Sequence, residues 1–176
     1  EGDFSFLSEK EALRRFKKLE DALQNTLKIA EKCTLEVPLG KWMFPEIPIE
    51  SGLSPDDELR RLVFLGFDSR GVSKDEKTLE RAEYELSVIK QKGYAPYFLV
   101  VADLLRYAKE NGILSNIRGS VSGSLVTFLS GITNINPLEY DIPFERFLNP
   151  DRPSAPDIDM DYADNRRDDM VEYARR

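Results

Sequence analysis

Three aspartates occupy alternate positions in the run PDIDMDYADNRRDD, residues 156–169. In an extended strand, side chains two residues apart share a face. Asp157, Asp159 and Asp161 are therefore expected to project together, while the intervening apolar side chains face the other way. Carboxylates on one face repel each other unless a cation neutralises them, and such hard oxygen ligands favour Mg²⁺ or Mn²⁺. The spacing predicts a divalent-metal platform.

A second group of residues suited to phosphate lies upstream, in the run RGSVSGS from Arg118 to Ser124. Its backbone N–H groups and hydroxyls precede an expected apolar helix, whose dipole and unpaired N–H groups favour an anion. Arg146 and Arg152 follow in the segment that enters the acidic strand, and arginine side chains bind phosphate oxygens bidentately. Together these groups are the components of two-metal phosphoryl or nucleotidyl transfer.

Each of these patterns also has an interpretation without catalysis. Acids at alternate positions are typical of a solvated edge strand, and a Gly-Ser run is typical of a linker. Arg146 and Arg152 can pair with the neighbouring acids Glu145 and Asp151 as ordinary surface charges.

A calcium-binding loop is a sharper alternative for the acidic stretch. The three alternating aspartates and Asp168 fall at positions 1, 3, 5 and 12 of an EF-hand frame. Position 6, however, holds Tyr162 in place of the glycine that the sharp turn requires, and position 12 holds Asp in place of Glu. The frame therefore favours the metal platform over the calcium loop.

The composition narrows the possible chemistry. The chain has 176 residues, of which 41% are apolar and 32% charged, as in folded globular proteins. No apolar run approaches the length of about 18 residues that spans a membrane, so we expect a cytoplasmic protein. A net charge of -7 disfavours a general nucleic-acid coating protein but leaves room for a local basic site. Histidine is absent, which excludes Ser-His triads and His-containing zinc sites.

Most of the remaining sequence shows helical periodicity and capping signals, and the expected fold class is α+β. The expected helices are residues 8–33 as one long or two short helices, Ser54-Pro55 to Gly66 or shortly after, 74–91, 95–112 and 124–129. The proline-rich run VPLGKWMFPEIPIESGLSP predicts an extended connector and a domain boundary. Ile113 and Leu114 suffice for a short strand only, and the residues before the acidic stretch look irregular.

Several ordered motifs resemble one family. They are GYAPYFLVVADLLRYAKENGI, RGSVSGSLV, ITNINPLEYD and FERFLNPDRPSAPDIDMDYADNRRDD. Together they closely resemble the alpha subunit of bacterial DNA polymerase III, the C family of replicative DNA polymerases. The runs LEDALQNTLKIAEKC and VPLGKWMFPEIP also resemble that family, where its N-terminal polymerase-and-histidinol-phosphatase (PHP) domain passes into the palm.

The resemblance implies two parts. Residues 1–50 would be the mostly helical C-terminal tail of the PHP domain with its connector. Residues 51–176 would be the N-terminal part of a palm of the DNA polymerase beta-like nucleotidyltransferase type. By motif, Asp157 and Asp159 become the catalytic ligands of two Mg²⁺ ions, and Asp161 is a neighbour that could be a further ligand.

The resemblance also assigns residues that bind the nucleotide phosphates. The family's phosphate-binding RGS-xx-GS is matched by Arg118, Gly119, Ser120, Gly123 and Ser124. Arg146 and Arg152 match the arginines of the family's FERFLNPER and are expected near the triphosphate. One departure lies just before this run, where Asn116 and Ile117 replace the Pro-Gly that is common in the family.

The implied function is that of a DNA-directed DNA polymerase in a full-length parent, acting on primer-template DNA and deoxynucleoside triphosphates. Its implied partners are a sliding clamp and other replisome subunits, with no membrane. The family's third catalytic carboxylate and its thumb and fingers would lie beyond this chain, so we expect the isolated fragment to be inactive. The alternatives are a noncatalytic scaffold or interaction module with the same fold, and another nucleotidyltransferase.

Overall fold

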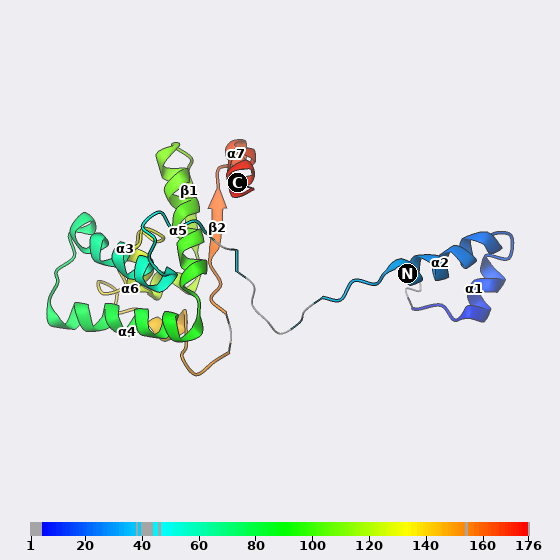
Figure 1. The fold of residues 1–176 in the computed structure, drawn as a ribbon, viewed down its shortest axis with the longest axis horizontal. Coiled ribbons are helices and arrows are strands. Elements are labelled where there is room, and N and C mark those ends of the chain that lie inside the picture. Colours follow the sequence, from blue (N-terminus) through cyan, green and yellow to red (C-terminus); the bar gives the residue numbers. More distant parts are fainter. Residues whose placement is uncertain (1–4, 38, 40–43, 46, 154, 176) are drawn as a thin grey trace. The chain divides into compact units, whose positions relative to one another are not determined.

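The computed structural model describes all residues except 1–4, 38, 40–43, 46, 154 and 176. Two compact units divide the chain, Glu1–Trp42 and Met43–Arg176 (Figure 1). In the described residues the regular structure consists of helices and a two-stranded sheet, which confirms the α+β class. The assignment of residues 1–50 to a PHP tail and of 51–176 to a palm stays a prediction. Part of the predicted connector lies outside the described residues.

The first unit contains two short helices, α1 (Glu9–Arg15) and α2 (Glu20–Lys32), which confirms the two-helix alternative. The first of them begins at the expected cap, because Oγ of Ser8 accepts the backbone N–H of Glu11 at 3.3 Å. The carboxylate of Glu11 in turn binds the guanidinium of Arg14. No residue of these two helices is buried.

Four helices of the larger unit precede the acidic strand. They are α3 (Pro55–Arg70), α4 (Glu76–Lys92), α5 (Ala95–Glu110) and the short α6 (Leu125–Leu129). Ser54 caps the start of α3 and Asp75 that of α4, each through a side-chain oxygen that accepts a backbone N–H. Left-handed glycines end both helices, Gly71 and Gly93, as glycine commonly does at this position.

Gly66 lies inside α3, and of the two ends expected from the sequence, at Gly66 or shortly after, the structure has the later one. The helix continues to Arg70. The reason is tertiary: a Cβ built at Gly66 would lie 2.1 Å from the carbonyl oxygen of Leu129 in α6. The glycine therefore allows two helix backbones to touch, and it is not a terminator.

The core of the larger unit lies between these helices and the segments that follow them. Its fully buried side chains include Phe67, Phe98, Leu125 and Phe144. Ile158, between two of the predicted catalytic aspartates, belongs to the same cluster. The apolar face of the acidic stretch is therefore fixed to the helical core.

The sheet pairs β1 (Ser115–Arg118) with β2 (Asp159–Tyr162) in antiparallel orientation. The short strand expected at residues 113–114 is thus displaced, because β1 begins at Ser115. Ile113 instead packs its side chain into a small cluster with Ala108 and Met170. Between the two strands the chain is irregular apart from short 3₁₀ turns and α6, as expected.

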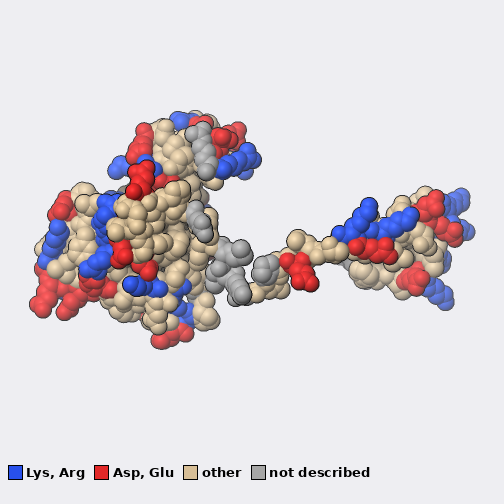
Figure 2. Space-filling view, viewed as in Figure 1, with Lys and Arg blue, Asp and Glu red and all other residues tan. Residues whose placement is uncertain are grey.

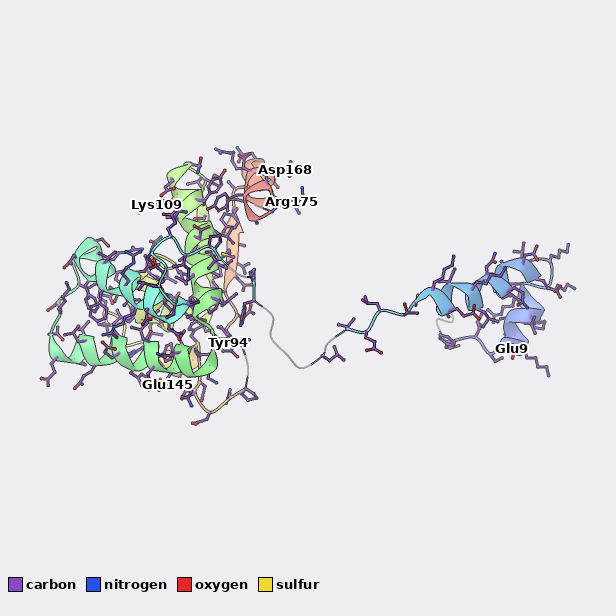
Figure 3. All side chains as sticks on the ribbon, viewed as in Figure 1. Glu9, Tyr94, Lys109, Glu145, Asp168 and Arg175 are labelled. Carbon is purple, nitrogen blue, oxygen red and sulfur yellow. The ribbon has the colours of Figure 1, made fainter. Side chains whose placement is uncertain are left out.

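The C-terminal helix α7 (Arg167–Ala174) packs against the end of α5. The rings of Tyr107 and Tyr173 stack with centroids 3.7 Å apart. Figure 3 shows Asp168 in α7 beside the end of α5 that carries Lys109. This contact fixes the direction in which the chain leaves β2.

Positive and negative side chains are interspersed over the visible face of the larger unit, and they do not form one basic surface (Figure 2). This distribution agrees with the net charge of -7. In the described part of the chain, every helix is too short or too polar to span a bilayer.

Substituting Gly66 by Ala tests the close contact between α3 and α6. We expect Gly66→Ala to lower the free energy of unfolding by about 3 kcal/mol or more, because the added methyl group overlaps a backbone oxygen that has little room to move. Leu65→Ala on the exposed face of the same helix is the control and should change it by less than about 0.5 kcal/mol. Urea unfolding followed by circular dichroism measures both, and equal effects would contradict the close contact.

Candidate active site

The β1–β2 pairing brings the acidic strand beside the Gly-Ser run. The register places Arg118 directly opposite Asp159. The backbone then turns at Gly119, whose φ of +96° favours glycine over other residues. A Cβ built at Gly119 would lie 4.0 Å from Oδ2 of Asp159. The start of the predicted phosphate loop therefore lies next to one predicted metal ligand.

The alternation expected of the acidic strand is confirmed. Asp157, Asp159 and Asp161 are exposed, whereas Ile158 is buried and Met160 is half-buried. β2 itself begins at Asp159, so Asp157 lies just before the strand. Neither the Asp157 nor the Asp159 carboxylate makes a hydrogen bond or ion pair with a described residue, which leaves these oxygens available to a ligand.

The backbone at Tyr162 contradicts the calcium-loop alternative. This residue lies in β2 and pairs with Ser115, so the chain is extended where an EF-hand loop must turn sharply. Within the described ranges, no three acidic, histidine or cysteine side chains are arranged to hold a metal ion. The exposed oxygens of Asp157 and Asp159 are nevertheless the ligand type that Mg²⁺ prefers. Metal binding by these residues and by Asp161 stays a prediction.

Arg118 is held by a carboxylate of the neighbouring strand. Its Nη2 donates to Oδ1 of Asp161 at 3.0 Å, and its Nε donates to Oδ2 of the same residue. This bidentate hydrogen bond from Arg118 lowers the pKa of the Asp161 carboxyl. Asp161 is thus occupied by the arginine, whereas Asp157 and Asp159 remain free toward the described residues.

Tyr97 in α5 contacts the backbone just before β2, and sequence reasoning missed this residue. Its hydroxyl oxygen accepts the backbone N–H of Ile158 at 3.2 Å. Burial raises the pKa of Tyr97, and the charges of Asp157 and Asp159 add to this effect. The hydroxyl therefore lies within the field of both aspartates. Tyr97 lies in a largely apolar helix, and no local pattern predicts its contact with a residue that is far away in the sequence.

The five loop residues predicted to bind phosphate fall into two groups. Arg118, Gly119 and Ser120 are exposed at the end of β1 and the start of the 3₁₀ turn Ser120–Gly123. Gly123 and Ser124 are buried. The structure thus separates an exposed part of the loop from an anchored part.

The hydroxyl of Ser124 is committed to protein contacts. It donates to Oε2 of Glu85 at 2.7 Å and accepts the N–H of Thr127 at 3.2 Å. The N–H groups of Leu125 and Val126, at the start of α6, also donate to Glu85. The donors that the sequence suggested for phosphate at this helix start are therefore already in use.

Arg146 and Arg152 are exposed, and within the described residues neither forms an ion pair. The suggested pairing of Arg146 with Glu145 is not observed, because the Glu145 carboxylate accepts the Tyr84 hydroxyl at 2.9 Å. The carbonyl of Arg152 accepts Nζ of Lys92 at 2.6 Å. In the described residues neither arginine forms a hydrogen bond or ion pair with the three aspartates, so their role at a triphosphate stays a prediction.

A hollow of about 1300 Å³ lies between α3, α5 and residues 130–135. Asn116, Ile117 and Ser122 border it, but the three aspartates and Arg118 do not. The hollow is therefore adjacent to the loop and separate from the acidic strand.

Comparison with known proteins decides the family. A model of the bacterial DNA polymerase III alpha NTPase domain matches residues 57–176. The chain belongs to the bacterial DNA polymerase III alpha family. The DNA polymerase III subunit alpha of Bacillus subtilis (strain 168) is 43% identical over 157 residues, which cover 89% of this chain and 14% of that protein.

Other polymerase III alpha subunits match equally broadly. The subunit of Halalkalibacterium halodurans is 41% identical over 178 residues, covering 100% of this chain and 16% of the relative. The subunit of Pseudomonas aeruginosa is 41% identical over 170 residues, which cover 90% of this chain and 14% of that protein. The chain thus spans about a seventh of the length of these polymerase III alpha relatives. The family resemblance drawn from the sequence motifs is confirmed.

Removing Arg118 tests the cross-strand contact. In Arg118→Gln we expect the pKa of Asp161 to rise toward the ordinary value of about 3.9, because the bidentate donor that favours the charged carboxylate is gone. A carbon-detected NMR titration of the carboxyl groups measures this. Arg166→Gln, which removes the separate pair with Asp169, should leave Asp161 unchanged. An Asp161 titration that is the same with and without Arg118 would contradict the contact.

Proposed function

We propose that the full-length polypeptide carrying this chain is a DNA-directed DNA polymerase, and that residues 51–176 form the N-terminal part of its palm. It would join a deoxynucleoside triphosphate to the 3′-hydroxyl of a primer on template DNA and release pyrophosphate. The observation that supports this most is the β1–β2 register, because it sets the exposed Asp159 beside Gly119. Family membership supports the same reaction.

In this proposal Asp157 and Asp159 hold two Mg²⁺ ions, together with a further carboxylate from elsewhere in the full-length polypeptide. Magnesium bound there would stabilise charge on the attacking and leaving oxygens. The exposure of both aspartates and their lack of described partners support this role. Tyr97 and the buried Ile158 hold the backbone between them, so the two carboxylates keep a fixed spacing.

The triphosphate would lie against the exposed part of the loop. Gly119, which lies next to Asp159, and Ser120 after it would supply backbone N–H groups, and Arg118 offers a bidentate donor. Asp161 keeps Arg118 oriented on this face without burying it, so the guanidinium can exchange the carboxylate for phosphate oxygens. Arg146 and Arg152 would approach from the segment that precedes the acidic strand.

The partners of the full-length protein follow from the same proposal. They are primer-template DNA, deoxynucleoside triphosphates, a sliding clamp and other replisome subunits. A noncatalytic scaffold with the same fold is the alternative, and it predicts that the full-length protein incorporates no nucleotide under any metal condition.

Conservative changes at the three aspartates test the proposal. In the full-length protein, Asp157→Asn and Asp159→Asn should each lower primer extension with Mg²⁺ by about 100-fold or more, since removing a direct ligand costs at least as much as removing a group behind it. Asp161→Asn, the matched control on the same face, should have a much smaller effect. Primer-template affinity should stay unchanged in all three variants. The assigned site would be excluded if the Asp157 and Asp159 variants extended the primer as fast as the unsubstituted protein.

The isolated chain of residues 1–176 should not extend a primer. Two carboxylates without a third ligand hold metal weakly, and the chain spans only about a seventh of its relatives. A primer-extension assay with Mg²⁺ or Mn²⁺ measures this, with the full-length protein as the positive control. Template-dependent extension by residues 1–176 would show that the fragment contains a sufficient site.

A further inference from the structure

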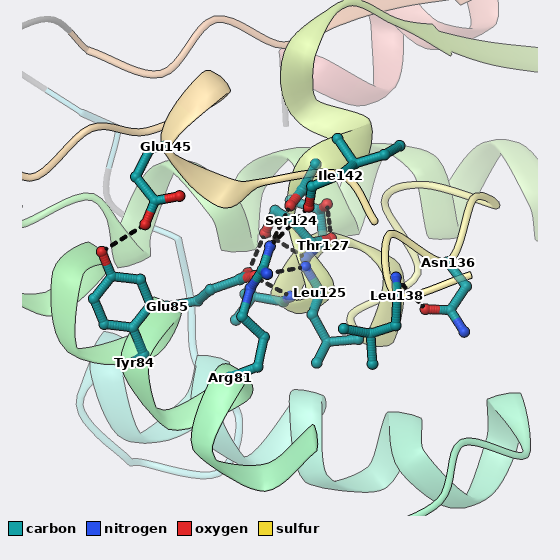
Figure 4. A network of polar contacts seen from close by, with 12 residues as sticks. Arg81, Tyr84, Glu85, Ser124, Leu125, Thr127, Asn136, Leu138, Ile142 and Glu145 are labelled. Atoms are coloured by element: carbon teal, nitrogen blue, oxygen red, sulfur yellow. Dashed lines mark hydrogen bonds and ion pairs between the residues drawn. The ribbon is translucent and has the colours of Figure 1, made fainter. Parts of the chain in front are cut away.

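A charged side chain is fully buried behind the candidate site. Glu85 in α4 has no exposed surface. Its two oxygens accept four donors: Ser124 Oγ at 2.7 Å, Leu125 N and Val126 N at 3.0 Å each, and Arg81 Nε at 2.6 Å. Figure 4 shows this carboxylate directed at the start of α6. One side chain of α4 thus adds to the Ser124 cap by accepting two further N–H groups at the beginning of α6.

Arg81 extends the network to two further segments. Its Nη2 donates to the carbonyl of Gly123 at 2.9 Å and to that of Ile142 at 3.2 Å. Gly123 itself allows the two segments to meet, because a Cβ built there would lie 2.9 Å from the carbonyl oxygen of Pro143. The Arg81–Glu85 pair therefore joins the end of the loop, the start of α6 and the segment that leads to Arg146 (Figure 4).

The network controls the position of the exposed loop residues because the loop is short. Only the 3₁₀ turn Ser120–Gly123 separates Gly119 from the anchored Ser124. Val121 inside this turn is fully buried, and its carbonyl accepts the hydroxyl of Thr127 at 3.0 Å. A shift at Ser124 therefore passes directly to Gly119, whose near contact is Asp159.

A buried ion pair is a poor way to gain stability, because desolvation offsets most of the attraction between the charges. Burial raises the pKa of Glu85, and the hydrogen bonds from Val126, Leu125, Ser124 and Arg81 oppose that rise. What the pair supplies beyond an apolar contact is direction, since each oxygen and each N–H fixes one partner at hydrogen-bonding distance. This favours a role in geometry over a role in stability alone.

We propose that Arg81 and Glu85 are positioning residues that set the exposed Gly119–Ser120 segment relative to Asp159 for the triphosphate of the incoming nucleotide. The proposal rests on the polymerase function proposed above and adds two residues of α4 to its site. Neither residue touches the nucleotide, and both act through the loop.

Glu85→Gln in the full-length protein is the main test. Glutamine keeps the shape of the side chain but replaces one carboxylate oxygen by an NH₂ group. Placed at Oε2, this donor would face two other donors, the Ser124 hydroxyl and the Val126 N–H. We expect the KM for the nucleotide to rise about 10- to 100-fold with a fall in kcat, the range for groups that hold a ligand-binding residue. The affinity for primer-template DNA should not change. The control is Tyr84→Phe, on the same helix as Glu85, which removes an exposed hydrogen bond to Glu145. Its KM and kcat should match those of the unsubstituted protein.

Arg81→Lys keeps the charge and is the milder variant if Glu85→Gln does not fold. A lysine ammonium can reach Glu85. It lacks the planar guanidinium through which Arg81 also donates to the carbonyls of Gly123 and Ile142. It should also raise the KM for the nucleotide. Faster hydrogen exchange at amides 119–126, at a temperature well below unfolding, should accompany the rise.

The outcomes separate the two proposals. A full-length protein that incorporates nucleotide, with an unchanged KM in folded Glu85→Gln and Arg81→Lys, would overturn the positioning role and leave the polymerase function intact. A lower kcat that merely follows the loss of folded protein would overturn it too. An unsubstituted full-length protein without template-directed incorporation would overturn the polymerase function and, with it, this role.

Discussion

The antiparallel pairing of β1 with β2 is the constraint on which the candidate site depends. It sets Arg118 opposite Asp159 and makes Gly119 the next residue after the strand. A slip of one residue would move the aspartates to the face now occupied by Ile158 and Met160, which would bury carboxylates in the core. The apolar face of β2 therefore fixes the register. The register in turn places Asp159 next to Gly119 at the start of the loop.

Behind this pairing, the buried Glu85 and its half-buried partner Arg81 fix the other end of the loop. Without Arg81 the Glu85 carboxylate would be left buried without its countercharge, which is unfavourable, so the loop end is firmly held. The exposed Arg118–Asp161 contact differs, because water screens it and either group can exchange its partner. The loop thus combines a rigid anchor at Ser124 with exchangeable donors at Arg118.

Local patterns predicted much of this structure, and long-range contacts account for the rest. Alternation located the exposed aspartates, and Ser8, Ser54-Pro55 and Gly93 marked helix ends correctly because capping is a local property. Gly66 marked the end of α3 only approximately, because its contact with Leu129 involves residues far apart in the sequence. The bond between Ser124 and Glu85 likewise joins residues far apart in the sequence. A signal did exist, since Glu85 lies on the helical stripe of Ala82 and Ile89, where a charge requires a buried partner.

The central claim is that Asp157 and Asp159 hold metal beside the Gly119–Ser120 segment. A crystal structure of the full-length protein with primer-template DNA, an incoming nucleotide and Mn²⁺, with anomalous data for manganese, tests it most directly. We predict manganese in direct coordination with oxygens of both aspartates, with the triphosphate against Gly119 and Ser120. Manganese bound elsewhere, or a triphosphate away from this loop, would contradict the account.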